Sequence, residues 1–364
     1  MFVPTTDVRT GVRVLLTGEY WPGANPTYWM RSFERCGAIV RFHDDMKYWP
    51  RWQTVAGKVA SRVLRRPMIA REWNEQLLRT TERFRPDLVF VSSGHLCDPR
   101  TLDELRSRGV PTVCKYYDPV WDATRGGFVN CVDRYDLLLT PRRWQADDFR
   151  RHGAREVLTI RFRCEPTVHR PVEVAQPARE RYGSDVCLIS SYRPRRAGML
   201  STLVAPPFDR SLRIWGSWEH APANAPYLPY CMGQTVEEGE IVTVYSSCSV
   251  ALHFVHREPT SSNRSERRGD EHNSRSFQIA SCGSALMIAP RTSEHQAFFE
   301  EDKEVVLFDD GEELTDKVRY WMCPARADQR ARIAAAGRER VLQQDYSYTP
   351  LARRVLRHFD LAAV

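Results

Sequence analysis

Long hydrophobic runs are missing from this sequence. No segment approaches the ~18 consecutive apolar residues that a transmembrane helix needs. The opening stretch, MFVPTTDVRT, lacks the basic and then apolar pattern of a secretory signal peptide. These two absences lead us to expect a cytoplasmic protein.

Metal-binding and disulfide patterns are missing as well. The ten cysteines are scattered, with no Cys-x-x-Cys pair and no Cys/His cluster at zinc-binding spacing. Several lie in apolar, strand-like segments, where a thiol serves as a small hydrophobic group. We expect reduced cysteines, no disulfide framework and no bound metal.

Lysine is scarce, since only five of the 53 basic residues are lysine and the rest are arginine. The net charge of +7 is mild for 364 residues and suits acidic ligands such as phosphates. Aromatic and basic residues do not gather in one stripe, which disfavours a nucleic-acid-binding protein. With 42% hydrophobic and 27% charged residues, the composition is that of a globular protein of roughly two domains.

Short apolar segments alternate with segments of helical periodicity. One series of strand-like segments covers 12–17, 38–42, 87–91, 111–116, 135–139 and 156–160, and a second covers 185–191, 212–217, 249–255, 285–290 and 304–308. Strands separated by helices form parallel sheets that are covered on both faces. The sequence therefore predicts an α/β protein with two Rossmann-like, doubly wound domains.

The two series are separated by a polar segment that contains Pro166, Pro171 and Pro177 and has no periodicity. The predicted parts are an N-terminal domain (1–165), a linker (166–182), a C-terminal domain (183–345), and a terminal helix (346–364) that packs back onto the first domain. Ligands of such sheets bind beyond the carboxyl ends of the strands. We expect the site in a cleft between the two domains.

The segment 51–73 is basic and also carries apolar residues at helical spacing. A helix of this kind can contact a membrane surface or a large acidic acceptor. A solvated basic helix face is the simpler explanation, because runs of charge usually mean no more than that.

The most informative stretch is DEHNSRSFQIASCG, which begins at Asp270. Its pattern predicts a helix with Ser274 as N-cap and a glycine at its end. The free N–H groups at Asn273 and Ser274, together with the helix dipole, suit a diphosphate. Arg275 adds a charged donor, and Gln278, one turn deeper, can hydrogen-bond ribose hydroxyls. Capped helices are common, so the stretch taken alone favours a structural role.

The segment Arg275–Gly283 (RSFQIASCG) resembles the R-x-F-E-I-x-A-x-G motif of the CgeB-type spore-maturation glycosyltransferases, relatives of glycosyltransferase family 4 in the group 1 superfamily. The similarity extends in the same order over most of the chain from about residue 80, including DVCLISSYRPRR (185–196) and IWGS (214–217). The resemblance implies the GT-B fold, with a nucleotide-sugar donor on the C-terminal domain and an acceptor on the N-terminal domain. Gln278 stands where the family has a glutamate that holds the ribose, and Ser190 stands in place of a glycine.

The resemblance also implies how the leaving phosphate is neutralised. Arg196 best matches the basic residue of the family and Arg193 comes second; both follow the strand-like segment DVCLISS. Arginines and a helix N-terminus can stabilise the leaving diphosphate without a metal, and no Asp-x-Asp motif stands at a suitable position. We therefore expect a retaining, metal-independent glycosyltransferase whose only co-substrate is a nucleotide-diphosphate sugar.

On the acceptor side, His95 and Asp118 follow strand-like segments of the first domain. Asp118 is the closer match to the catalytic-side position of the family and can orient a hydroxyl or move a proton. A turn at Asp118-Pro119 is the alternative explanation, and His95 fits an acceptor contact and a structural role equally well. Gly18 lies in the first loop, which approaches the donor in this fold, although turn chemistry explains it equally well.

Two other functions remain open. A nucleotide-sugar 2-epimerase has the same fold but keeps more acidic and histidine residues in its cleft than this sequence offers. A non-catalytic protein that binds a sugar nucleotide would account for Gln278 and Ser190. The joint presence of Asp118, Arg196 and Arg275 favours the transferase.

Overall fold

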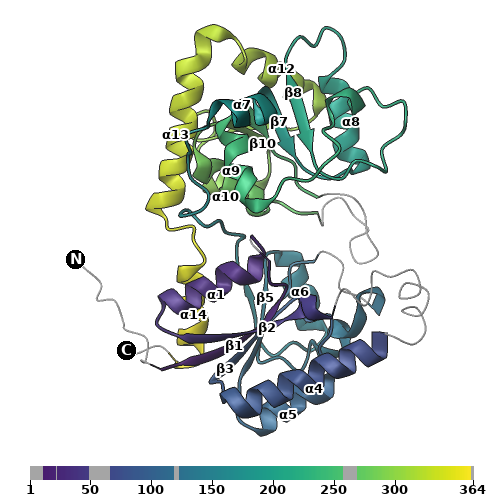
Figure 1. Ribbon diagram of the computed structural model, residues 1–364, viewed down its shortest axis with the longest axis vertical. Helices are drawn as coiled ribbons and strands as arrows, with labels where there is room; N and C mark the ends of the chain where they lie inside the picture. Colours follow the sequence, from purple (N-terminus) through teal and green to yellow (C-terminus); the bar gives the residue numbers. More distant parts are fainter. Residues whose placement is uncertain (1–10, 22, 49–65, 119–122, 257–268, 362–364) are drawn as a thin grey trace. The chain divides into compact units, whose positions relative to one another are not determined.

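The computed structural model describes residues 11–21, 23–48, 66–118, 123–256 and 269–361 (Figure 1). They form two compact units: residues up to Arg161 and from Tyr348 onward make up the first, and residues from Phe162 to Ser347 the second. Of the basic segment 51–73, the part up to residue 65 lies outside the described residues. No helix within the described ranges is both long enough and apolar enough to cross a membrane.

The first unit is built on a six-stranded parallel sheet with the order β2-β1-β3-β4-β5-β6. Val14 of β1, the second strand from one edge, pairs with Val40 of β2 on one side and with Leu88 of β3 on the other. The strands are β1 (Arg13–Gly18), β2 (Ile39–Asp44), β3 (Leu88–Ser92), β4 (Thr112–Lys115), β5 (Leu137–Thr140) and β6 (Val157–Thr159). The helices are α1 (Asn25–Arg35), α4 (Arg66–Phe84), α5 (Pro99–Ser107), α6 (Arg143–Arg151) and α14 (Thr349–His358), with short 3-10 turns η1 (Asp45–Lys47) and η3 (Ala123–Cys131).

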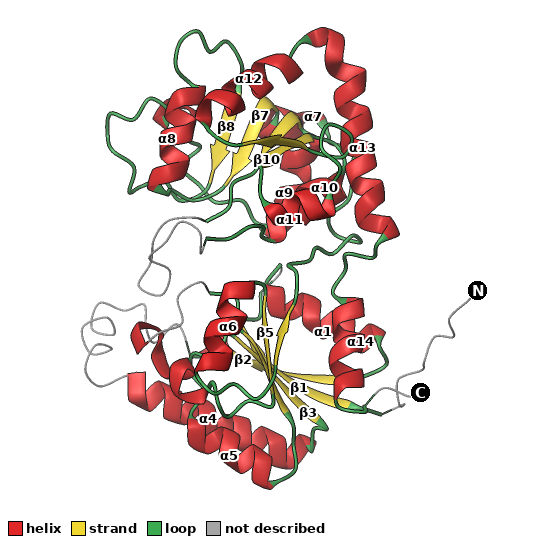
Figure 2. Cartoon of the chain, turned by 180° about the vertical axis from the view of Figure 1, so that it is seen from behind, coloured by secondary structure: helices red, strands yellow, loops and turns green. Residues whose placement is uncertain are grey.

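Helices cover both faces of this sheet, as Figure 2 shows. Strand β3 reads LVFVS and is buried along its whole length, because neither face meets water. On one face, Trp29 of α1 packs against Phe90 of β3 with ring centroids 4.6 Å apart. On the other face, Trp73 of α4 is buried in a cluster with Leu15 of β1 and Val91 of β3.

The second unit is built on a five-stranded parallel sheet with the order β11-β10-β9-β7-β8. The strands are β7 (Ser184–Ile189), β8 (Leu212–Trp215), β9 (Cys248–Leu252), β10 (Leu286–Pro290) and β11 (Val306–Phe308). The helices are α7 (Gln176–Tyr182), α8 (Pro194–Leu203), α9 (Glu238–Ser246), α10 (Ser274–Cys282), α11 (Ser293–Phe298), α12 (Gly311–Trp321) and α13 (Ala327–Gln343), with the 3-10 turns η4 (Leu228–Tyr230) and η6 (Pro324–Arg326).

Two apolar clusters fill the two faces of the second sheet. Cys187 of β7 is buried with Val244 of α9 and Phe277 of α10 on one face. The neighbouring residue Leu188 points to the opposite face, where it is buried with residues of α8 and α12. Successive strand residues alternate between faces, so a strand covered on both sides must be apolar throughout.

The predicted pair of doubly wound parallel sheets is confirmed: each of the predicted strand-like segments overlaps a strand of the corresponding sheet. Within 166–182, which the sequence analysis assigned to a linker, Gln176–Tyr182 form α7 of the second unit, and Tyr182 packs against Trp215 with ring centroids 5.4 Å apart. At the other end of the chain, Tyr348 precedes α14 and stacks on Tyr28 of α1 at 5.7 Å.

Candidate functional site

In each sheet the strand order reverses once, beside the first strand of the unit. Strand β1 lies between β2 and β3, and strand β7 lies between β8 and β9. In open α/β sheets, ligands bind beyond the carboxyl ends of the strands at such a switch point. The carboxyl ends of β7 and β9 therefore mark the candidate site of the second unit, and those of β1 and β3 the candidate site of the first.

Helix α10 begins beyond the carboxyl end of β9, and its N-cap is Asn273. The Asn273 side chain accepts a hydrogen bond from the Arg275 N–H at 2.9 Å, and the Asn273 N–H donates to the Ser276 hydroxyl in return. The prediction that Ser274 is the cap was wrong: Ser274 is the first helical residue. Asparagine is as good a cap as serine, and here its extended backbone places its side chain over the first turn. Gly283, in the left-handed conformation with φ +62°, ends the helix as predicted.

Arg275 and Gln278 interact on the first turns of α10. The Arg275 Nη1 donates to the Gln278 Oε1 at 2.8 Å, and Gln278 is buried. A glutamate at position 278 would form an ion pair with Arg275 and offset its charge. The amide does not carry that negative charge, so the glutamine leaves the full charge of Arg275 at the start of the helix.

The segment after β7 carries the two other predicted phosphate ligands. Arg193 is the N-cap residue of α8 and makes no side-chain cap bond. Arg196 lies in the first turn of α8, where its Nη1 donates to the Ser191 carbonyl and its guanidinium lies 5.9 Å from the centre of the Phe254 ring. The loop between β7 and α8 is held by Trp218, directly after the IWGS segment, because the Trp218 indole donates to the Ser190 carbonyl at 2.7 Å.

The structure brings Arg196 and Arg275 to the same end of the sheet. The positive charges of both arginines lower the pKa of His253, the residue directly after β9. Burial is the main cause that holds the pKa of His253 well below its ordinary value, and His295, Arg196 and Arg275 lower it further. A small pocket at this edge is lined by Arg196, Phe254 beyond β9, Pro290 of β10 and Phe308 of β11, among other residues. The edge therefore combines positive charge with a helix N-terminus, the combination that anions favour.

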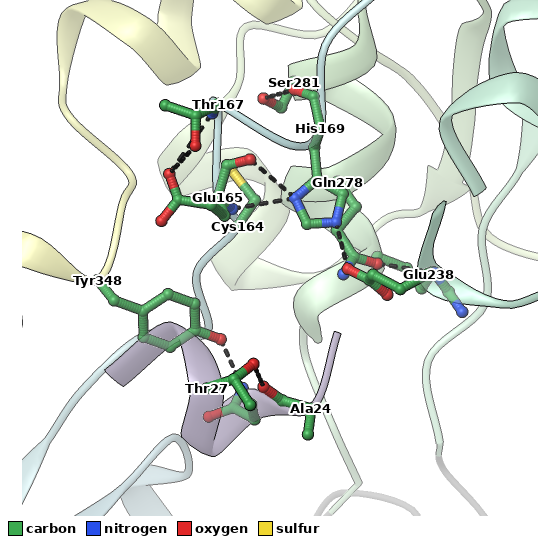
Figure 3. Close-up of polar contacts among 12 residues, drawn as sticks. Ala24, Thr27, Cys164, Glu165, Thr167, His169, Glu238, Gln278, Ser281 and Tyr348 are labelled. Carbon is green, nitrogen blue, oxygen red and sulfur yellow. Dashed lines mark hydrogen bonds and ion pairs between the residues drawn. The ribbon is translucent and has the colours of Figure 1, made fainter. Parts of the chain in front are cut away.

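Behind α10, a buried histidine ties the start of the second unit to two of its helices (Figure 3). The Nε2 of His169 lies 2.7 Å from the Glu238 carboxylate at the start of α9, and its backbone carbonyl accepts from the Ser281 hydroxyl of α10. A carboxylate can only accept, so the Nε2 of His169 carries a proton and donates it to Glu238, while the Nδ1 lies 3.0 Å from both the N–H and the carbonyl of Glu165. This arrangement supports α10 from its C-terminal half.

In the first unit, Gly18 ends β1 with φ +151°. A Cβ at this position would lie 2.6 Å from the Pro26 Cγ of α1, much closer than atoms can pack. The close approach of α1 to β1 therefore requires a glycine, whatever Gly18 contributes to binding.

His95 and Asp118 both lie beyond the carboxyl edge of the first sheet. His95 follows β3 and packs edge-on against Tyr116, with ring centroids 5.6 Å apart. Asp118 follows β4, is partly buried, and has its backbone carbonyl held at 2.7 Å by the Gln145 side-chain amide of α6. The alternative turn at Asp118-Pro119 extends into residues outside the described part of the chain.

Sequence reasoning missed Lys115, the last residue of β4. Its side chain is buried, its Nζ donates to the side-chain Oδ1 of Asn25 in α1, and it lies 4.9 Å from the centre of the Tyr117 ring. Burial lowers the pKa of Lys115 to about 7. The signal in the sequence was the rare use of lysine within an apolar strand segment of an arginine-rich chain.

A carboxylate cluster at the ends of β1 and β2 was also missed. The Asp45 carboxylate accepts from the Trp73 indole at 2.6 Å. The pKa of Asp45 is raised to about 7, mainly by burial; the hydrogen bond from Trp73 opposes the rise, and the nearby charges of Glu19 and Asp44 contribute to it. The pair Asp44-Asp45 at the end of a predicted strand could have pointed to this cluster.

Among the described residues, no group of three or more histidine, cysteine, aspartate or glutamate side chains is arranged to hold a metal ion. No curated protein has a sequence that matches this chain. Residues 195–357, less than half of the chain, match the model of a family described as glycosyl transferase-like. This match includes α8 and α10, the two helices whose first turns carry Arg196 and Arg275.

Several solved structures share the fold over nearly the whole chain. Sucrose-phosphate synthase from Thermosynechococcus elongatus has a TM-score of 0.64 at 13% identity, covering 96% of this chain and 98% of that one. HepE from Anabaena, solved in complex with UDP-glucose, has a TM-score of 0.62 at 12% identity, covering 96% and 99%. A putative UDP-N-acetylglucosamine 2-epimerase from Listeria monocytogenes has a TM-score of 0.57 at 9% identity, covering 96% and 97%.

At these identities the likeness establishes the fold. The chain has the GT-B fold that its resemblance to group 1 glycosyltransferases implied, with two Rossmann-like units. The family match adds that residues 195–357, which include most of the second unit, are similar in sequence to a family described as glycosyl transferase-like.

Proposed function

We propose that this protein is a glycosyltransferase that moves a sugar from a nucleoside-diphosphate sugar to an acceptor, with retention of configuration and without a metal. The observation that carries the proposal is the positive edge of the second sheet, where Arg196, Arg275 and the N-terminus of α10 converge at the switch point. The glycosyltransferase-like match of residues 195–357 supports it.

In this proposal the donor diphosphate binds at the start of α10. The backbone N–H groups of the first turn face the phosphates, and Arg275 and Arg196 add charged donors. Arg193, the N-cap residue of α8, adds a further positive charge near the diphosphate. These groups neutralise the negative charge that develops on the diphosphate as the sugar leaves, a role that a metal ion has in other transferases. Gln278 hydrogen-bonds the ribose hydroxyls.

The acceptor is proposed to bind at the carboxyl edge of the first sheet. Asp118 orients the acceptor hydroxyl or takes its proton, and His95 contacts the acceptor beside it. UDP is the first nucleotide to test, because HepE was solved with UDP-glucose.

The test measures UDP release from UDP-glucose and UDP-N-acetylglucosamine, with and without a panel of mono- and disaccharide acceptors, in the presence of EDTA. We expect acceptor-dependent UDP release by the wild-type chain and its loss in Arg275→Ala. Arg319→Ala removes an exposed arginine from α12 and serves as the matched control.

An epimerase is the second candidate, since the Listeria structure shares the fold. An epimerase would convert UDP-N-acetylglucosamine to its 2-epimer without an acceptor. Nuclear magnetic resonance distinguishes this epimer from the free UDP that a transferase releases. Formation of the epimer with no acceptor-dependent transfer would replace the transferase proposal.

A further inference from the structure

Ser276 lies in the first turn of α10 and is fully buried between two buried imidazoles. Its Oγ is 3.0 Å from the His253 Nε2 and 2.9 Å from the His295 Nε2. The same oxygen accepts the Asn273 N–H at 3.3 Å. One hydroxyl therefore meets three hydrogen-bonding partners, and all of them come from the edge of the sheet that carries the proposed diphosphate site.

The partners fix the direction of each hydrogen bond. The His295 Nδ1 lies 2.8 Å from the Pro290 carbonyl, which can only accept, so this nitrogen carries a proton. The Nε2 of a neutral His295 is then an acceptor, and the Ser276 hydroxyl donates to it. A hydroxyl has one proton, so the His253 Nε2 must be the donor in its contact with Ser276. The two histidines hold opposite tautomers.

The hydrogen-bond chain from His253 through Ser276 to His295, called the relay below, requires a neutral His295. A second proton on His295 would face the proton of Ser276 and break their hydrogen bond. His253 carries its Nε2 proton whether the ring is neutral or charged, so it can donate to Ser276 in either state. Burial is the main cause that holds the pKa of His253 well below its ordinary value, and the charges of Arg196 and Arg275 lower it further, so His253 is the neutral Nε2 tautomer in the relay.

The relay ties the start of α10 to three other elements. His253 follows β9 and its N–H donates to the Ile288 carbonyl of β10 at 2.9 Å. His295 belongs to α11, and Pro290 ends β10. Ser276, His253 and His295 are all buried, so water cannot replace the hydrogen bonds if one is lost.

We propose that Ser276 is a positioning residue for the diphosphate site: its hydroxyl, held between His253 and His295, fixes the first turn of α10 against the carboxyl edge of the sheet. Ser276 does not itself contact the phosphates. The relay holds the backbone N–H groups of that first turn where the donor must meet them. This proposal rests on the proposed function, because the ligand it serves is the nucleoside diphosphate.

The first experiment determines the tautomers of His253 and His295 in the ligand-free protein. Nitrogen-15 spectra of the full chain with labelled histidine report which ring nitrogen carries the proton. We expect His295 with its proton on Nδ1 and His253 with its proton on Nε2, assigned through His295→Phe and His253→Phe. The same tautomer in both rings would overturn the relay.

The second experiment measures UDP-glucose affinity by calorimetry. The diphosphate of UDP-glucose is bonded at both ends, so it keeps its charge near neutral pH. Ser276→Ala is expected to weaken binding about tenfold, the effect of losing roughly one hydrogen bond's worth of positioning. His295→Phe removes the acceptor of the relay while Ser276 stays in place, and is expected to weaken binding similarly.

Ser281→Ala is the matched control, because it removes another buried hydroxyl from the same helix, one that donates to the His169 carbonyl. It is expected to lower the melting temperature without changing the affinity. If the control weakens binding as much as Ser276→Ala does, or if Ser276→Ala binds normally, the positioning role is overturned. If the wild-type chain binds neither UDP nor UDP-glucose, the proposed donor is wrong, while the tautomers still test the relay.

Discussion

Two arginines from distant parts of the sequence place their positive charges near the same imidazole, that of His253. Their combined charge determines what the edge of the second sheet can bind. Arg196 lies in the first turn of α8 and Arg275 in the first turn of α10, and the positive charges of both lower the pKa of His253. Like charges gathered at a sheet edge are unfavourable unless an anion joins them. The site is therefore electrostatically ready for a diphosphate before any donor arrives.

Arg196→Ala tests whether the charge of this one side chain contributes to diphosphate binding. We expect UDP binding to weaken by about 1.5–3 kcal/mol, the range of a charge-assisted hydrogen bond. Calorimetry measures the change, and Arg319→Ala again controls for the loss of a positive charge elsewhere in the unit. Unchanged affinity would remove Arg196 from the site.

Asp118→Asn tests whether Asp118 takes part in the transfer reaction or in donor binding. The proposed donor ligands all belong to the second unit, so UDP affinity should stay nearly intact while turnover at saturating donor falls roughly 10²-fold or more. Asparagine is also a good turn former, so a purely structural role predicts near-normal turnover with a normal melting curve. A variant that melts early would show that Asp118 supports the fold.

At the scale of the elements, the strands could be predicted from the sequence and the helix starts could not. The strands are apolar along their length because helices cover both faces, and LVFV at 88–91 shows this without any tertiary information. The cap of α10 was assigned one residue too late, because Asn273 and Ser274 are equally able to cap and only the backbone decides between them. Ser276, His253 and His295 are far apart in sequence, so their contact was invisible until the sheet joined them.

The start of α10 yields a prediction of its own. Asn273→Ala removes the side chain that accepts the Arg275 N–H and that donates to the Phe254 carbonyl at 3.3 Å. Loss of a cap costs about 1 kcal/mol of stability, and the freed first turn should also bind UDP more weakly. Asp98→Ala, which removes the cap of α5 in the first unit, is the control: it should lower stability similarly and leave UDP affinity unchanged.

At the scale of the whole molecule, buried ionisable groups in both units couple stability to pH. Burial lowers the pKa of Lys115 to about 7, against 10.5 for an ordinary lysine. Between these values the unfolded chain binds a proton that the folded chain does not, so this group makes the free energy of unfolding rise with pH from about 7 to 10.5. Buried cysteines such as Cys164, whose pKa burial raises to about 12, act in the opposite direction above pH 9. Because these groups oppose each other, the difference in unfolding free energy between a variant and the wild type is more informative than the pH dependence of the wild type alone.

Lys115→Met isolates the contribution of this lysine. Methionine fills a similar volume without a charge to bury, so the variant should be more stable than the wild type at pH 7. Its advantage should shrink by about 1 kcal/mol for each pH unit between 7.5 and 9.5, because folding of the wild type releases the proton of Lys115 and this release costs less free energy as the pH rises. Equilibrium urea denaturation at several pH values measures the difference. Lys47→Met, at an exposed lysine of η1, should show no such trend. A constant difference for Lys115→Met would mean that the folded protein keeps the ammonium charged, and that Asn25 and the surrounding aromatic rings hold it as a cation.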